Sequence, residues 1–209
     1  MKFIKNLLAI SILLFSTQVF AEPVAGKDFK LVEPAQATHS GKKIEVLEFF
    51  FYGCSHCFHL HPELASWERK IPKDVELVLV PTVFNPNWEP MAYTYYALEV
   101  LGKSQELHND LYEAWNVKNI ILTDESKITD FVAQYGVDRK KFSDAYHSFG
   151  VNSKVTRSKQ LSQSYRISGT PTLIVDGKYL ITGLQPADAV RVMSELIDKV
   201  RKERGTGKR

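Results

Sequence analysis

Residues 49–57 read FFFYGCSHC, and this stretch holds Cys54 and Cys57, the only two cysteines of the 209-residue chain. The residues that lead into it, 44–51 (IEVLEFFF), are nearly all apolar or β-prone, which predicts a strand covered on both faces. After a short turn, apolar residues recur at helical spacing, at Cys57, Leu60, Leu64 and Trp67. We therefore expect the cysteine pair where a buried strand passes into a helix.

Two cysteines separated by two residues at the start of a helix can close a small ring. The first thiol then faces the positive end of the helix dipole, which favours the thiolate, the nucleophile of thiol–disulfide exchange. His56, between the thiols, can add a proton-dependent positive charge or a hydrogen bond. Because a stabilised thiolate stabilises the reduced form, the disulfide becomes oxidising. The spacing predicts a redox pair in which Cys54, at the helix cap, is the nucleophile and Cys57, one turn in, is the resolving cysteine.

The N-terminus has the features of a secretory signal peptide over residues 1–21. Two lysines precede an apolar run over 7–15, and residues 19–21 (VFA) suit cleavage after Ala21. A membrane anchor is the alternative, but the run is well short of the roughly 20 residues that span a bilayer. We expect the cleaved chain to work in an oxidising compartment.

The amino-acid composition limits the classes of function that the chain can have. The chain has 27 Lys and Arg residues against 24 Asp and Glu residues, and cleavage after Ala21 removes two of the lysines and no acid, which leaves a formal charge of +1. This even balance is not the basic footprint of a nucleic-acid-binding protein. The apolar content of 44% is ordinary for a globular protein, so the fold does not need disulfides to hold it.

The rest of the chain predicts an α/β fold. Residues 75–83 (VELVLVPTV) indicate a second buried strand, and residues 172–175 and 179–181 flank an Asp-Gly pair, which is a strong hairpin signal. Residues 186–200 predict a closing helix. Between the second strand and the hairpin, amphipathic runs predict a helical block, with helices at 91–101, 107–115, 128–135, 142–149 and 151–165.

The segment 49–57 resembles the active-site segment of the DsbA family, periplasmic thiol oxidases of the thioredoxin superfamily, and His56 is its most telling match. The order of elements is similar too, because DsbA-like proteins resemble thioredoxin with a helical domain inserted between the second core strand and the C-terminal hairpin. The resemblance covers essentially the whole mature chain. It implies a thioredoxin-like domain over residues 22–83 and 167–209 and an inserted helical domain over 84–166.

The resemblance also implies a proline that faces the redox pair. Thioredoxin-like proteins place a cis-proline there, just before a strand, and Pro171 in residues 169–172 (GTPT) lies at that point. Thr170 would then offer its backbone to an extended, cysteine-containing substrate peptide and its hydroxyl near the thiols. The alternative for Thr170 is a plain strand-entry residue, because strands enrich threonine.

Glu48 is an acid inside the first predicted strand. Burial would raise its pKa, and it could then exchange protons with the buried thiol. DsbA-like proteins are similar in carrying a glutamate beneath the active site. The lysine that accompanies it in the best-known member has no counterpart in residues 75–83. A solvated acid at a strand edge is therefore the alternative.

The cysteines and histidines of this segment allow other roles in principle. A zinc site would need Cys54, Cys57 and nearby histidines such as His59 and His61, but consecutive turns of one segment do not easily aim four ligands tetrahedrally, so no metal is expected. Haem attachment needs histidine directly after the second cysteine, where Phe58 stands. A structural disulfide without redox activity remains an alternative role for the two cysteines. The remaining histidines are expected on the surface, at His39, His108 and His147.

The resemblance implies a periplasmic enzyme that donates its Cys54–Cys57 disulfide to folding secreted proteins and needs no other cofactor. It also implies a DsbB-like membrane quinone reductase as the re-oxidising partner. A disulfide isomerase or reductase of the same superfamily is the first alternative. Such isomerases add an N-terminal dimerisation domain, for which residues 22–43 leave no room, so a monomer is expected. A non-enzymatic periplasmic chaperone or metal-binding protein is the second alternative.

Overall fold

The computed structural model describes residues 22–206. The predicted signal peptide, residues 1–21, lies outside this described part of the chain. Within residues 22–206, no helix combines the length and the apolar character that crossing a membrane requires.

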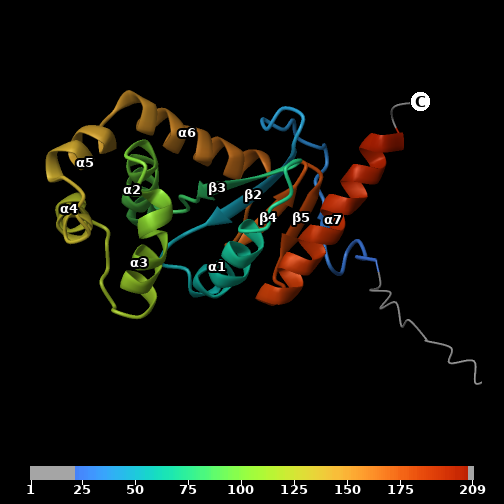
Figure 1. Ribbon diagram of the computed structural model, residues 1–209, viewed down its shortest axis with the longest axis horizontal. Coiled ribbons are helices and arrows are strands. Elements are labelled where there is room, and N and C mark those ends of the chain that lie inside the picture. Colours follow the sequence, from blue (N-terminus) through green and yellow to red (C-terminus); the bar gives the residue numbers. More distant parts are fainter. Residues whose placement is uncertain (1–21, 207–209) are drawn as a thin grey trace, which may run out of the picture.

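A five-stranded mixed sheet with the order β1-β5-β4-β2-β3 forms the centre of the fold (Figure 1). Strands β2 and β3 are parallel, and the other neighbours are antiparallel. All seven residues of β2 are buried, which confirms the predicted strand with two covered faces. The strands are β1 (Lys30–Leu31), β2 (Ile44–Phe50), β3 (Val75–Pro81), β4 (Thr172–Val175) and β5 (Tyr179–Thr182).

Helices cover both faces of the sheet. Val46 of β2 packs in one apolar cluster with residues of α1 (Ser55–Glu68) and α7 (Pro186–Thr206), while Leu47 and Phe49 point to the opposite face. This alternation follows from the period of two in a strand. Glu48 therefore lies on the α1 face of β2, the same face as Val46. The closing helix α7 runs six residues beyond its predicted end, residue 200.

The predicted Asp-Gly hairpin is present and tightly built. Asp176 and Gly177 both have positive φ, of 53° and 68°, and Lys178 N–H donates to Val175 O at 3.0 Å. Two left-handed residues give the turn a twist that matches the flanking strands. Gly177 is required for a second reason, because a Cβ there would lie 2.1 Å from Gln36 O.

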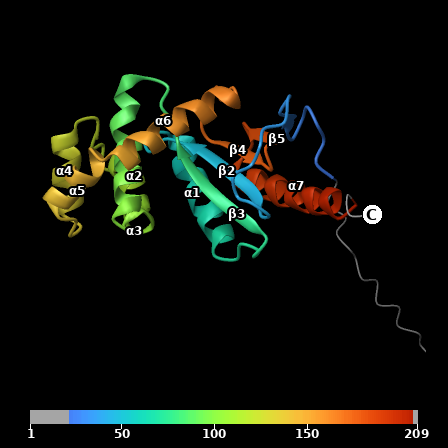
Figure 2. The same ribbon diagram turned by 90° about the horizontal axis from the view of Figure 1, so that it is seen from above.

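The helical block predicted between the second strand and the hairpin is also present, with α2 to α5 at one end of the sheet and α6 running from them back to the sheet beside β3 (Figure 1). Figure 2 shows the same separation, with α2 to α5 at the left and α7 at the right. Side-chain oxygens of Asp124, Asp138 and Ser148 cap three of the helices by accepting backbone N–H bonds, which explains where these helices begin. The block consists of the short 3₁₀ turn η1 (Pro86–Trp88), α2 (Glu89–Val100), α3 (Ser104–Asn116), α4 (Glu125–Ala133), α5 (Arg139–Tyr146) and α6 (Phe149–Ser164).

Candidate active site

Cys54 is the N-cap residue of α1. Its backbone is extended, with φ −90° and ψ 114°, and its sulfur accepts a hydrogen bond from Cys57 N–H at 3.4 Å. The sulfur takes the place that a serine or aspartate oxygen usually has at this position. Cys54 N–H donates to Phe51 O at 3.0 Å, which closes the turn between β2 and α1. The sequence thus places one thiol at the positive end of a helix.

The two thiols have opposite electrostatic environments. Cys54 is half-buried, and its pKa is lowered to about 5. The largest cause is a hydrogen bond from the Cys57 thiol. Burial opposes this effect, and further hydrogen bonds from Thr170 and from the backbone of Cys57 and His56 lower the pKa again. Cys57 is fully buried, and desolvation raises its pKa far above the usual range for a thiol. At neutral pH the pair therefore holds one thiolate and one thiol, with the thiolate on the outside.

The loop before β4 meets this pair. The Thr170–Pro171 peptide bond is cis, and Cys54 Sγ lies 3.2 Å from Thr170 O, to which it donates when it is protonated. Thr172 Oγ1 donates to Gly169 O at 2.8 Å, which braces the same loop. Thr170 thus lies beside Cys54, and the cis-proline Pro171 follows it directly.

The histidines of α1 differ in their surroundings. His56 and His59 are exposed, while His61 is half-buried and burial lowers its pKa. The contribution from His56 to the low pKa of Cys54 comes from its backbone. Among residues 22–206, no group of three or more His, Cys, Asp or Glu side chains is arranged to hold a metal ion.

Glu48 is buried beneath α1. Burial raises its pKa to about 8, and the nearby Glu68 and Cys54 add to the rise. Its cross-strand neighbours are Leu79 on β3 and Leu173 on β4, so neither flanking strand supplies a cation. Glu48 Oε1 has no hydrogen-bond partner within the described residues. Glu48 is therefore buried, and the alternative of a solvated acid at a strand edge is wrong.

Comparison with known proteins adds to this geometry. Residues 73–193 match the family model described as the DSBA-like thioredoxin domain. Over 180 residues, the chain is 36% identical to the thiol:disulfide interchange protein DsbA of Burkholderia cepacia, with 85% of this chain and 84% of that protein covered. The chain belongs to the DsbA family.

Solved DsbA structures have the same fold as this member of the family. The crystal structure of DsbA from Xylella fastidiosa matches with a TM-score of 0.82 at 32% identity, over 87% of this chain and 100% of that one. The structure of Pseudomonas aeruginosa DsbA matches with a TM-score of 0.83 at 32% identity, over 90% and 97%. The α/β, thioredoxin-like fold is thereby confirmed, and the chain is a disulfide oxidoreductase of the DsbA family.

The prediction of a surface position for His108 is wrong. In this DsbA-family chain His108 is buried on α3, its Nδ1 is 2.8 Å from Tyr52 OH, and its ring centroid is 4.8 Å from that of His61. Burial and then His61 lower its pKa to about 3, so the ring is neutral. The signal was present in the sequence, because His108 precedes Leu111 and Tyr112 by three and four residues, on one helical face.

Asn116, at the end of α3, was not identified from the sequence. Its side-chain amide donates to Tyr52 O and to Tyr112 O, both at 2.8 Å. Together with His108, it holds Tyr52 at both its hydroxyl and its carbonyl. Since Tyr52 stands two residues before Cys54, helix α3 of the DsbA insertion fixes the turn that carries the redox pair.

Proposed function

We propose that the Cys54–Cys57 disulfide oxidises the thiols of secreted proteins while they fold in the periplasm. The observation that carries this proposal is the contrast between the two thiols: an accessible Cys54 with a pKa of about 5 and a buried Cys57 with a raised pKa. A stabilised thiolate is a good leaving group and lowers the free energy of the reduced enzyme. The first effect speeds the release of Cys54 from the mixed disulfide, and the second makes the disulfide of the protein oxidising.

The exchange proceeds in two steps. A substrate thiolate attacks Cys54 Sγ, the Sγ–Sγ bond breaks, and the electron pair leaves on Cys57, which takes up a proton. A second substrate thiolate then attacks the substrate sulfur of this mixed disulfide and releases Cys54 as a thiolate. The substrate gains a disulfide and loses two electrons, and the enzyme is reduced by the same two electrons.

We assign the surrounding residues to roles in these steps. Thr170 and Pro171 bind the extended substrate backbone beside Cys54, a role supported by the contact between Cys54 Sγ and Thr170 O. Glu48 exchanges the proton of Cys57, because a carboxyl with a pKa of about 8 can both give and take a proton near neutral pH. His56 is the residue at the helix start that stabilises the Cys54 thiolate, through its backbone N–H.

Turnover requires an electron acceptor for the reduced pair. We assign this to a DsbB-like quinone reductase in the membrane, on the basis of the family, with the disulfide itself as the only redox group of the chain. We further propose that residues 22–83 and 167–209 form the thioredoxin-like domain and 84–166 the inserted helical domain of a monomer exported by its signal peptide.

Trapping tests the assignment of the cysteines. The Cys57→Ser variant, mixed with an unfolded model protein that contains a disulfide, should form a covalent complex, because Cys54 opens the substrate disulfide and no resolving thiol reverses the step. The matched Cys54→Ser variant should form no complex, and neither variant should oxidise reduced substrates. A complex formed only by Cys54→Ser would reverse the two roles.

A further inference from the structure

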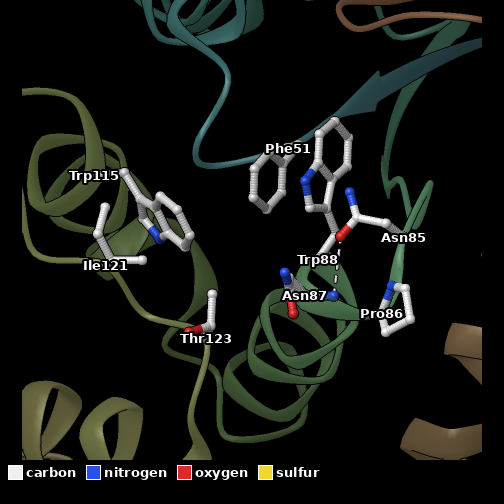
Figure 3. Close-up of a pocket in the computed structure, with 8 residues that line it drawn as sticks. All are labelled: Phe51, Asn85, Pro86, Asn87, Trp88, Trp115, Ile121 and Thr123. Atoms are coloured by element: carbon white, nitrogen blue, oxygen red, sulfur yellow. Dashed lines mark hydrogen bonds between the residues drawn. The ribbon is translucent and has the colours of Figure 1, made fainter.

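A hollow of about 560 Å³ lies beside the redox turn (Figure 3). Three segments build it: Phe51 directly after β2, residues 85–88 after β3, and Trp115, Ile121 and Thr123 from the end of α3 and the connection to α4. Neither the cysteine chemistry nor the binding of substrate backbone at Pro171 uses this hollow.

Aromatic rings form the floor of the hollow. Phe51 stacks on Trp88 with 3.9 Å between ring centroids and an interplanar angle of 6°, and Trp115 meets Phe51 edge-on at 5.3 Å. Figure 3 shows Trp115 on one side and Trp88 on the other, with Phe51 between them. Such faces and edges favour another aromatic ring over an aliphatic group of the same size.

The polar groups of the hollow are uncharged. The lining residues carry amide and hydroxyl side chains, at Asn85, Asn87 and Thr123, and no ionisable group. The absence of a counter-charge disfavours an ionic ligand.

The hollow adjoins the reactive cysteine. A Cβ at Gly53 would lie 2.5 Å from the Phe51 ring and 2.8 Å from the Trp115 ring, so the backbone of Gly53 rests directly on the aromatic floor. Cys54 is the next residue, and the three steps along the backbone from Phe51 to Cys54 span at most about 11 Å. A chain attached to Cys54 therefore reaches the hollow within a few residues.

The openness of the hollow indicates the kind of occupant. Residues 85–87 are exposed, Ile121 is 52% exposed, and the exposed ring of Phe84 lies against Trp88 at 5.2 Å between centroids. A free small molecule would stay largely in water here, and buried ligands are the ones that bind tightly. A side chain already tethered through a disulfide at Cys54 is present at a high effective concentration and can use a shallow site.

We propose that this hollow is a subsite for an uncharged aromatic side chain of the polypeptide whose cysteine reacts with Cys54. The proposal rests on the proposed thiol oxidation and adds a substrate preference to it. Cysteines with tryptophan, tyrosine or phenylalanine a few residues away are oxidised faster than cysteines in aliphatic surroundings.

Short peptides test the subsite. The second-order rate constant for oxidation is measured with the oxidised protein and reduced two-cysteine peptides that carry tryptophan, leucine or alanine at one to four residues on either side of the attacking cysteine. At the best position, tryptophan should react about fivefold faster than leucine, the size of one favourable aromatic contact. In Ile121→Arg, which puts a long charged side chain at the mouth, the tryptophan-to-leucine ratio should fall towards one.

Val100→Arg is the matched control, because Val100 is equally exposed but lies at the opposite end of α2 from Trp88. It should keep the tryptophan preference. Equal rates for all peptides at every position, or a preference that survives in Ile121→Arg, would overturn the subsite while leaving thiol oxidation intact. If no peptide is oxidised, the proposed function fails and the subsite fails with it.

Discussion

Replacement of Glu48 by glutamine should stabilise the reduced protein by an amount that grows with pH. Glu48 has an ordinary pKa of 4.5 in the unfolded chain and about 8 in the fold, where burial is the main cause. Between these two values the folded state binds a proton that the unfolded state has lost. Stability of the wild-type protein therefore falls as pH rises through this window, and glutamine, which does not titrate, removes that loss.

The magnitude follows from the width of the window. At about 1.4 kcal/mol per pH unit, the interval from 4.5 to about 8 corresponds to about 5 kcal/mol above pH 8 and about 3 kcal/mol at pH 7. The low pKa of Cys54 changes stability in the opposite direction, but it is present in both proteins. The difference between the variant and the wild type thus isolates Glu48.

Urea unfolding of the two reduced proteins, followed at several pH values between 4 and 8, measures this difference. Glu63→Gln is the control, because Glu63 is an exposed glutamate on α1, and its removal should change stability little at any pH. If the free energies of unfolding of Glu48→Gln and wild type run parallel across this range, burial does not hold the Glu48 carboxyl in its neutral form and the argument is refuted.

Three further predictions concern other parts of the fold. The ultraviolet absorbance of the Cys54 thiolate in the reduced protein should titrate with a midpoint at about pH 5. The free energy of unfolding that this thiolate contributes should be lost as pH falls through that value. A midpoint near pH 9 would contradict the lowered pKa of Cys54. Asn116→Ala should cost about 1–3 kcal/mol in urea unfolding, because the carbonyl of Tyr52 loses its partner, and Asn116→Asp, which lacks the N–H donor, should not restore it. Gly177→Ala should cost clearly more than Gly136→Ala, since both have positive φ but only Gly177 faces a backbone oxygen; equal losses of thermal stability would remove the steric argument.

Local patterns were enough to predict the frame of the site. The apolar run of β2, the cap position of Cys54 and the Asp-Gly hairpin depend on residues close together in the sequence, and each lies in the structure where its pattern places it. The helical insertion was predictable for the same reason. Its amphipathic runs differ from the observed helices α2 to α6 by a few residues at the ends.

Contacts between distant segments were not predictable in this way. Strand β1 has only two residues and exists because Lys30 and Leu31 pair with β5. His108 is polar by composition and is buried because Tyr52, 56 residues earlier, supplies a hydrogen bond. The hollow needs Phe51 and Trp115 to meet across the turn, and no single segment carries that information. Pairing partners far apart in the chain decide these features.

The reduction potential of the Cys54–Cys57 pair tests the central claim most directly. Equilibration of the protein in glutathione buffers of known composition gives the fraction reduced and hence the potential. A thiolate stabilised at Cys54 predicts a potential well above about −180 mV, the value for protein disulfide isomerase. A potential near the roughly −270 mV of thioredoxin would mark the pair as a reductant and contradict the proposed oxidation of substrate thiols.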